Sequence, residues 1–258
     1  MRPYKIIIAY DGTDYHGWQE QAPGVHTIAS TLQDAFHKVF GHAIKVVGAS
    51  RTDAGVHALG QVARFYTDLQ ISPEIMLKAW NGGLPPAIHI RSLEPIVAAN
   101  EERLEQTRLF HPQHNVKEKT YHYYFACKRP SPFFARYCYF NPYALDIEKV
   151  RDCLQLFVGK HDFASFCVEQ CKDNTVCEID AITLEYSEQF DCWQVTVKGK
   201  RFLHYMIRRM VGAALHIASS KNLSPQLILE ALEKPGVYDH LPTAPAQGLV
   251  LKNIEYEK

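Results

Sequence analysis

The order of strands and helices predicted from the residue pattern constrains this chain most. Short β-rich apolar runs alternate with amphipathic helical runs up to residue 93, and the alternation begins again at residue 120. Strands are expected at residues 4–10, 43–49, 61–67, 88–93, 120–127, 178–186, 192–198 and 248–256. Helices are expected at residues 28–40, 73–81, 146–158 and 202–219, and after Ser224 and Pro225. Strands interleaved with helices in two similar halves predict an α+β protein.

The helix expected at residues 28–40 has the clearest signals. Thr27 is a suitable N-cap, and Gly41 ends the pattern. Ile28, Leu32 and Phe36 recur at every fourth residue and give the helix one apolar face.

Residues 94–119 are polar and irregular, and they separate the two halves as a candidate linker. A chain of 258 residues has room for one large domain or for two smaller ones that share a core. We therefore expect an N-terminal α/β domain at residues 1–105 and a C-terminal α/β domain at residues 106–258.

The charge balance excludes a protein that is coated in positive charge. Lys plus Arg number 28 and Asp plus Glu number 28, so the formal net charge is zero. Nucleic-acid binding is still open, because it needs a local basic patch and not a basic average. Positive charge gathers at residues 117–119, 128–129, 198–201 and 208–209.

No membrane segment or signal sequence is expected. The longest apolar runs fall far short of the roughly 18 residues that a membrane helix needs, and the first residues lead straight into a strand pattern. The seven cysteines are an odd number in a chain without an export signal. We therefore expect a cytoplasmic protein with reduced thiols.

Asp53 is the first candidate for chemistry. It lies in a polar loop between two expected strands, two residues after Arg51 and two before Gly55. A nearby guanidinium helps a carboxylate to stay ionised, and an ionised, partly enclosed Asp can act as a nucleophile. The alternative is an Asp that caps the turn and pairs with Arg51 at the surface. The spacing alone leaves both interpretations open.

Tyr121 and Tyr123 share one face of an expected strand, and Tyr124 points the other way. Lysines precede them, at positions 117 and 119. Such aromatic residues either belong to the core or stack on a nucleobase.

The helix expected at residues 202–219 carries two arginines. Leu203, Ile207, Met210 and Ala214 form its apolar face. Arg208 lies at the edge of this face, and Arg209 is expected to point further outward. Arg208 is therefore either a side chain that reaches into solvent or one partner of a partly buried ion pair.

Two other kinds of site agree poorly with the sequence. Asp11, Gly12 and Thr13 resemble the end of an aspartyl-phosphatase motif, but Ala9 stands where that motif has its nucleophile. The spacings of His161, Cys167, Cys171 and Cys177 fit no common zinc pattern. We therefore expect no metal at these residues, and His57 and His204 are interpreted as structural.

The string R-T-D-A-G-V-H-A at residues 51–58 resembles the signature of the tRNA pseudouridine synthase family often called TruA. The resemblance extends over nearly the whole chain. Further motifs follow in order at residues 10–13, 17–19, 81–85, 110–111, 162–166, 202–212 and 248–249.

The resemblance implies a reaction and a role for each of four residues. Asp53 corresponds to the nucleophile, which attacks uridine at C6 of the base or at C1′ of the ribose. Arg51 corresponds to the residue that holds the target nucleotide out of the stack, Tyr121 to the one that stacks on the uracil, and Arg208 to the ion-pair partner of the nucleophile. The uridines concerned are at tRNA positions 38, 39 and 40, in the anticodon arm.

The resemblance also implies two RNA-recognition-like (ferredoxin-like) domains whose mainly antiparallel sheets join across a central catalytic cleft. It implies a homodimer that binds tRNA without cofactor or metal. The chain departs from the family pattern at Gln113, at Cys167, and around Asn174 and Glu178, which leaves the range of tRNA substrates open. The alternative function is a non-catalytic RNA-binding module or tRNA chaperone on the same fold.

Overall fold

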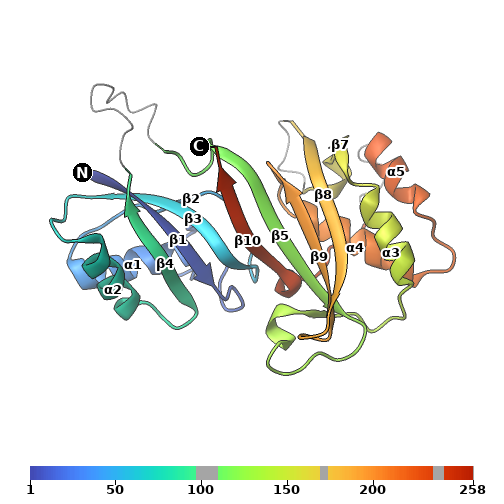
Figure 1. Ribbon diagram of the computed structural model, residues 1–258, viewed down its shortest axis with the longest axis horizontal. Helices are drawn as coiled ribbons and strands as arrows, with labels where there is room; N and C mark the ends of the chain where they lie inside the picture. Colours follow the sequence, from blue (N-terminus) through green and yellow to red (C-terminus); the bar gives the residue numbers. More distant parts are fainter. Residues whose placement is uncertain (97–109, 169–173, 235–240, 258) are drawn as a thin grey trace. The chain divides into compact units, whose positions relative to one another are not determined.

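The computed structural model describes residues 1–96, 110–168, 174–234 and 241–257. The chain divides into two compact units, one of residues 1–117 with 251–258 and the other of residues 118–250. Both units combine helices with mainly antiparallel strands, so the α+β class is confirmed (Figure 1). The predicted domain boundary after residue 105 lies outside the described residues.

The first unit holds a sheet in the strand order β4-β1-β3-β10, and β2 also pairs with β3. Its strands are β1 (Arg2–Tyr10), β2 (Val47–Gly48), β3 (His57–Thr67), β4 (Ile88–Pro95) and β10 (Leu249–Tyr256). Its helices are α1 (Ile28–Phe40) and α2 (Pro73–Gly83). Phe36 of α1, Phe65 of β3 and Trp80 of α2 pack edge to face, with centroids 4.8–5.6 Å apart. This aromatic cluster joins both helices to the sheet in one core.

Helix α1 confirms its prediction at both ends. The Thr27 side chain accepts from the backbone N–H of Ser30, and the Ser30 hydroxyl accepts from the N–H of Thr27. This reciprocal capping box satisfies two N–H groups that have no partner within the helix. Gly41 closes the helix with φ 71°, a left-handed conformation that glycine adopts without strain.

The second unit holds a sheet in the order β5-β9-β8-β7, with β6 paired to β5. The strands are β5 (Val116–Ala126), β6 (Tyr139–Phe140), β7 (Gly159–Asp162), β8 (Val176–Ser187) and β9 (Cys192–Gly199). The helices are α3 (Ile147–Gln155), α4 (Met206–Ser219) and α5 (Gln226–Glu233), with short 3₁₀ turns at Ala135–Tyr137, Ala164–Phe166 and Ala246–Gly248. Arg151 and Gln155 of α3 donate to backbone carbonyls of β8 and fasten the helix to the sheet.

The strand expected at residues 43–49 is only two residues long, because side-chain amides replace the backbone partner at both ends. Gln33 accepts from the N–H of Val46. Gln61 accepts from the N–H of Ser50 and donates to its carbonyl. These amides satisfy the backbone without a continuous ladder.

The helix expected at residues 202–219 begins later, at Met206. Tyr205 has φ 64° and ψ −1°, a left-handed conformation that cannot continue a right-handed helix. Residues 202–205 therefore form a separate turn ahead of α4. No helix within the described ranges is both long and apolar enough to cross a membrane.

Candidate active site

Asp53 lies in a tight turn between β2 and β3. Its carbonyl accepts from the N–H of Val56 at 3.1 Å, and Gly55 inside the turn has φ 77°. Thr52 before it is buried, Asp53 is half-buried and Arg51 is exposed. The loop thus sets the Asp53 side chain at the boundary between core and solvent.

The segment after β1 fastens this turn from the other side. The N–H of Trp18 donates to the Thr52 carbonyl at 3.0 Å, and the N–H of Gly55 donates to the Tyr15 carbonyl at 3.2 Å. The hydroxyls of Tyr10 and Thr52 are hydrogen-bonded at 2.7 Å. The backbone on both sides of Asp53 is therefore held by residues some forty positions earlier.

Gly17 is the point where the two segments come closest. It has φ 86°, and a Cβ built on it would lie 2.6 Å from the Thr52 carbonyl oxygen. Any other residue would be strained in its backbone and would push the Asp53 turn away. This contact joins the motif at residues 17–19 to the motif at residues 51–58.

His57 connects the Asp53 turn to Asp11 and Gly12, at the start of the segment that follows β1. Its Nδ1 accepts from the N–H of Gly12 at 3.0 Å, and an oxygen of Asp11 lies 3.2 Å from the same nitrogen. The Asp11 carboxylate also accepts from the N–H of Thr13 at 3.0 Å, which is an Asx turn. Asp11 and His57 thus serve the loop structure, as expected for His57.

Tyr121 lies on β5 of the second unit and is 6% exposed. Its ring packs edge to face against Phe202, with centroids 5.2 Å apart. Tyr123 is also buried, whereas Tyr124 is half-buried and its hydroxyl is hydrogen-bonded to His122. The predicted alternation of the three tyrosines is confirmed.

Arg208 lies on α4, and its guanidinium contacts the Ala244 carbonyl and the Tyr205 ring. Its Nε donates to the Ala244 carbonyl at 2.8 Å, and the N–H of Ala244 donates back to the Arg208 carbonyl at 2.9 Å. The guanidinium carbon lies 4.6 Å from the centroid of the Tyr205 ring. A cation over an aromatic face is attracted by the ring's negative centre, so the left-handed Tyr205 also supports Arg208.

Comparison with known proteins decides the family. A family model described as tRNA pseudouridine synthase matches residues 6–100 and 153–257. A tRNA pseudouridine synthase A from Thermodesulfovibrio yellowstonii is 36% identical over 98% of this chain and 98% of its own length. Proteins of the same description from a Thermoanaerobacter species and from Solibacter usitatus are 35% and 36% identical, each over 99% of this chain and 100% of their own length.

The chain belongs to the tRNA pseudouridine synthase family. This confirms the resemblance drawn from residues 51–58 and the other motifs, and it places the chain among the isomerases. The first unit of the synthase carries Asp53 and Arg51 together on one loop, and the second carries Tyr121 and Arg208. Among the described residues, no group of His, Cys, Asp and Glu is arranged to hold a metal ion. Cys171 of the rejected zinc pattern lies outside them.

Arg209 of the synthase does not point outward as expected. Its Nη1 donates to the Cys167 carbonyl at 2.8 Å and to the Ser165 carbonyl at 3.3 Å, and its Nε is buried. The short 3₁₀ turn at Ala164–Phe166 leaves carbonyl groups without partners of their own, and the guanidinium satisfies them. Sequence periodicity cannot detect this use of Arg209, because the acceptors are about forty residues away.

The departures from the family pattern have structural roles here. Gln113 donates to the Gly48 carbonyl at 3.0 Å. Cys167 serves Arg209 through its carbonyl, so that contact does not depend on its side chain. Asn174 has φ 68° and accepts from Arg201 through its carbonyl at 2.8 Å.

Lys119 was noted in the sequence only as one of two lysines that precede the tyrosines. It lies two positions before Tyr121, on the same face of β5, and burial lowers its pKa to about 8. Its position two residues before Tyr121, at the edge of an expected strand, indicated that both side chains share one face of the sheet. A half-buried amine on this face is a candidate to meet a negatively charged group of the substrate.

We expect Lys119→Met to stabilise the folded synthase at pH 7, where the wild-type protein holds a partly desolvated cation. Between pH 8 and 10.5 the unfolded chain keeps the proton and the folded protein loses it, so wild-type stability rises with pH and the gain shrinks. Urea unfolding at pH 7 and at pH 10 measures both differences. Lys117→Met, at an exposed position of the same strand, is the control. A gain that is the same at both pH values would contradict the prediction.

Proposed function

We propose that this synthase converts uridine to pseudouridine at positions 38, 39 and 40 of the tRNA anticodon arm, with Asp53 as the nucleophile. The observation that carries the assignment is the fixed backbone around Asp53. Thr52, the residue before Asp53, is hydrogen-bonded to Trp18 and Tyr10. The carbonyl of Asp53 accepts the hydrogen bond that closes the turn. A nucleophile held in one geometry reacts as if within a single molecule, which removes much of the entropic barrier.

The proposed reaction begins when the Asp53 carboxylate attacks the uridine at C6 or at C1′. The N1–C1′ glycosidic bond then breaks, the base rotates, and a C5–C1′ bond forms. A proton leaves C5, another is taken up at N1, and the carboxylate is released. The atoms and electrons of substrate and product are the same, so the step consumes no oxidant, reductant or group donor.

The other three residues have roles around this step. Arg208 pairs with the Asp53 carboxylate and favours its ionised form. Tyr121 stacks on the uracil, and its packing against Phe202 fixes the plane of its ring. Arg51, which is exposed, holds the nucleotide after it has left the helical stack.

The family resemblance extends this proposal to the architecture. Each unit is then an RNA-recognition-like domain, and their sheets join across the catalytic cleft. The active form is a homodimer that binds tRNA. The mainly antiparallel sheet with helices in each unit supports the assignment of domain type.

The test is to incubate the purified protein with unmodified tRNA transcripts and to map pseudouridine at single-nucleotide resolution. We expect modification at positions 38, 39 and 40 and at no uridine outside the anticodon arm. Binding without modification would favour the RNA chaperone. Modification only at a distant position would refute the proposed tRNA positions and leave the enzyme class intact.

A further inference from the structure

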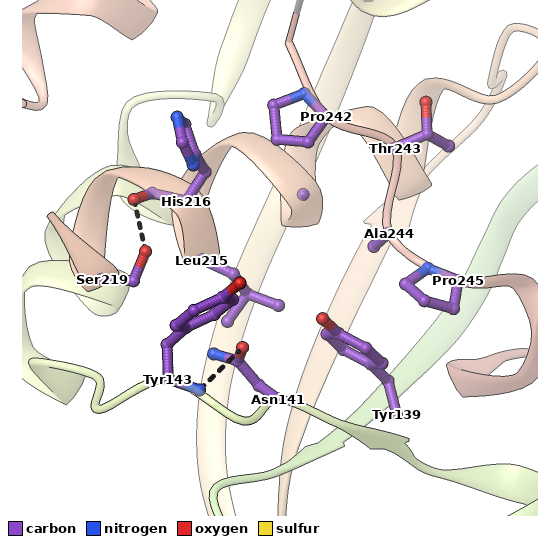
Figure 2. A pocket seen from close by; sticks show the side chains of 11 residues that line it. Tyr139, Asn141, Tyr143, Leu215, His216, Ser219, Pro242, Thr243, Ala244 and Pro245 are labelled. Atoms are coloured by element: carbon purple, nitrogen blue, oxygen red, sulfur yellow. Dashed lines mark hydrogen bonds between the residues drawn. The ribbon is translucent and has the colours of Figure 1, made fainter.

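A small cavity in the second unit is not used by the proposed reaction. Its volume is about 160 Å³, and it lies between α4, the chain after β6 and the segment that follows residue 240 (Figure 2). Tyr139 and Tyr143 stand on either side of the Asn141 amide, and Leu215, Pro242 and Pro245 add apolar surface. Among the described residues, none of the side chains that line the cavity is a Lys, Arg, Asp or Glu. The cavity is therefore suited to an uncharged ligand.

Asn141 supplies the polar group of this cavity. The residue is 3% exposed, and its side-chain oxygen accepts from the N–H of Tyr143 at 3.5 Å. Its amide nitrogen donates to no other residue within the described part of the chain. The nitrogen is not among the fully enclosed donors of the described residues, so it is accessible from the cavity and can donate to a ligand that carries a carbonyl group.

The size and the lining narrow the ligand further. A cavity of about 150 Å³ can hold one benzene ring, so this cavity has room for one six-membered ring. Two phenol rings beside an amide donor suit a flat heterocycle with a ring carbonyl, since unpaired bases of RNA stack on tyrosine and bond to side-chain amides. Uracil and cytosine both have a carbonyl at C2. A single-ring pyrimidine therefore satisfies the volume, the aromatic lining and the amide.

The wall of the cavity also touches a proposed catalytic residue. A Cβ on Gly212 of α4 would lie 2.1 Å from the Pro242 carbonyl oxygen. Helix α4 and the segment that follows residue 240 are therefore too close at this point for any side chain larger than that of glycine. Two residues further on, Ala244 both accepts from Arg208 and donates to it. A ligand that orders this segment would therefore also steady Arg208.

We propose that this cavity binds one unpaired pyrimidine base of the tRNA substrate, with the Asn141 amide donating to its C2 carbonyl and the rings of Tyr139 and Tyr143 beside it. The proposal rests on the tRNA substrate of the proposed function. The base belongs to the RNA and not to a free nucleotide, because the described lining has no Lys or Arg to hold a 5′-phosphate.

The first experiment locates the base. A tRNA transcript with 5-iodocytidine in place of cytidine keeps all its uridines, and ultraviolet light joins the iodinated base to an adjacent aromatic side chain. The full-length protein is irradiated with this tRNA and the crosslinked peptide is identified by mass spectrometry. We expect the crosslink at Tyr139 or Tyr143.

The second experiment uses variants of the same protein. Thr243→Trp places a large ring at the exposed rim of the cavity without changing a buried residue, and Asn141→Leu removes the amide. Both should abolish the crosslink and raise the KM for tRNA at least about fivefold, because base stacking on aromatic side chains is lost. Asn222→Trp, at an exposed position outside the cavity, is the control and should behave as wild type.

The outcomes separate this proposal from the proposed function. Pseudouridine formation without a crosslink at either tyrosine would overturn the cavity assignment and leave the activity in place. A crosslink that survives Thr243→Trp would also overturn it. In a third measurement, free cytidine is added and the NMR resonances of the His216 ring are followed. A shift of these resonances without any crosslink to tRNA would mean that the cavity binds a free nucleoside and not a base of the RNA. If Asn141→Leu fails to fold, Thr243→Trp still decides the question.

Discussion

Asp53→Asn should abolish pseudouridine formation while the protein remains folded and still binds tRNA. An amide of the same shape cannot act as the carboxylate nucleophile, and loss of a nucleophile reduces turnover by a factor on the order of 10⁴ or more. The turn itself should survive, because its hydrogen bonds run through the backbone of Asp53 and through Thr52. Single-turnover release of the C5 hydrogen from labelled tRNA measures the loss.

The matched control is Asp34→Asn, which makes the same chemical change at an exposed position of α1. Its turnover and melting temperature should equal those of the wild type. Substantial pseudouridine formation by Asp53→Asn would remove Asp53 from the role of nucleophile. A large drop in its melting temperature would instead support the alternative in which Asp53 serves only the turn.

Arg208→Ala should lower both turnover and stability. The substitution leaves the Ala244 carbonyl without its guanidinium donor and removes the cation over the Tyr205 ring. Loss of a hydrogen bond to a charged group costs about 1.5–3 kcal/mol. If Arg208 also pairs with Asp53, the cost rises towards roughly 3–5 kcal/mol, because a partly buried carboxylate loses its partner. Thermal unfolding and single-turnover kinetics measure the two effects.

Arg209→Ala separates a structural loss from a catalytic one. Arg209 is the residue after Arg208 on α4, and its guanidinium also donates to backbone carbonyls. It has no role in the proposed reaction. We expect this variant to lose stability and to keep its turnover at a temperature where it is folded. Normal melting and normal turnover in Arg208→Ala would rule out the proposed ion pair.

The elements that the sequence predicted well are those with local signals. Helix α1 has its capping residue, its apolar spacing and its terminal glycine within fifteen positions, and the structure agrees at each of them. Asp146 caps α3, and the hairpin of β8 and β9 is present, for the same reason. Local hydrogen bonding and side-chain periodicity determine these elements, and both can be recognised along the chain.

The misjudged features depend on residues that are distant in the sequence. Gln33 and Gln61 shorten β2 from positions more than ten residues away. Arg209 turns inward to meet carbonyls of a 3₁₀ turn about forty residues earlier. The burial that lowers the pKa of Lys119 likewise arises from tertiary packing. In the candidate site the residue types of Asp53, Tyr121 and Arg208 were recognisable from motifs, but the contacts that hold the Asp53 turn were not.

Strand β10 has a consequence for how the protein is made. It lies beside β3 in the sheet of the first unit, yet the ribosome produces it after all of the second unit. While residues 118–250 are being synthesised, the part of β3 that does not pair with β2 has backbone N–H and C=O groups that still await β10. Unpaired strand edges on a nascent chain promote aggregation, and contacts between distant residues form slowly. The loop that carries Asp53 leads directly into β3, so the strand next to this loop reaches its full pairing only after β10 has left the ribosome.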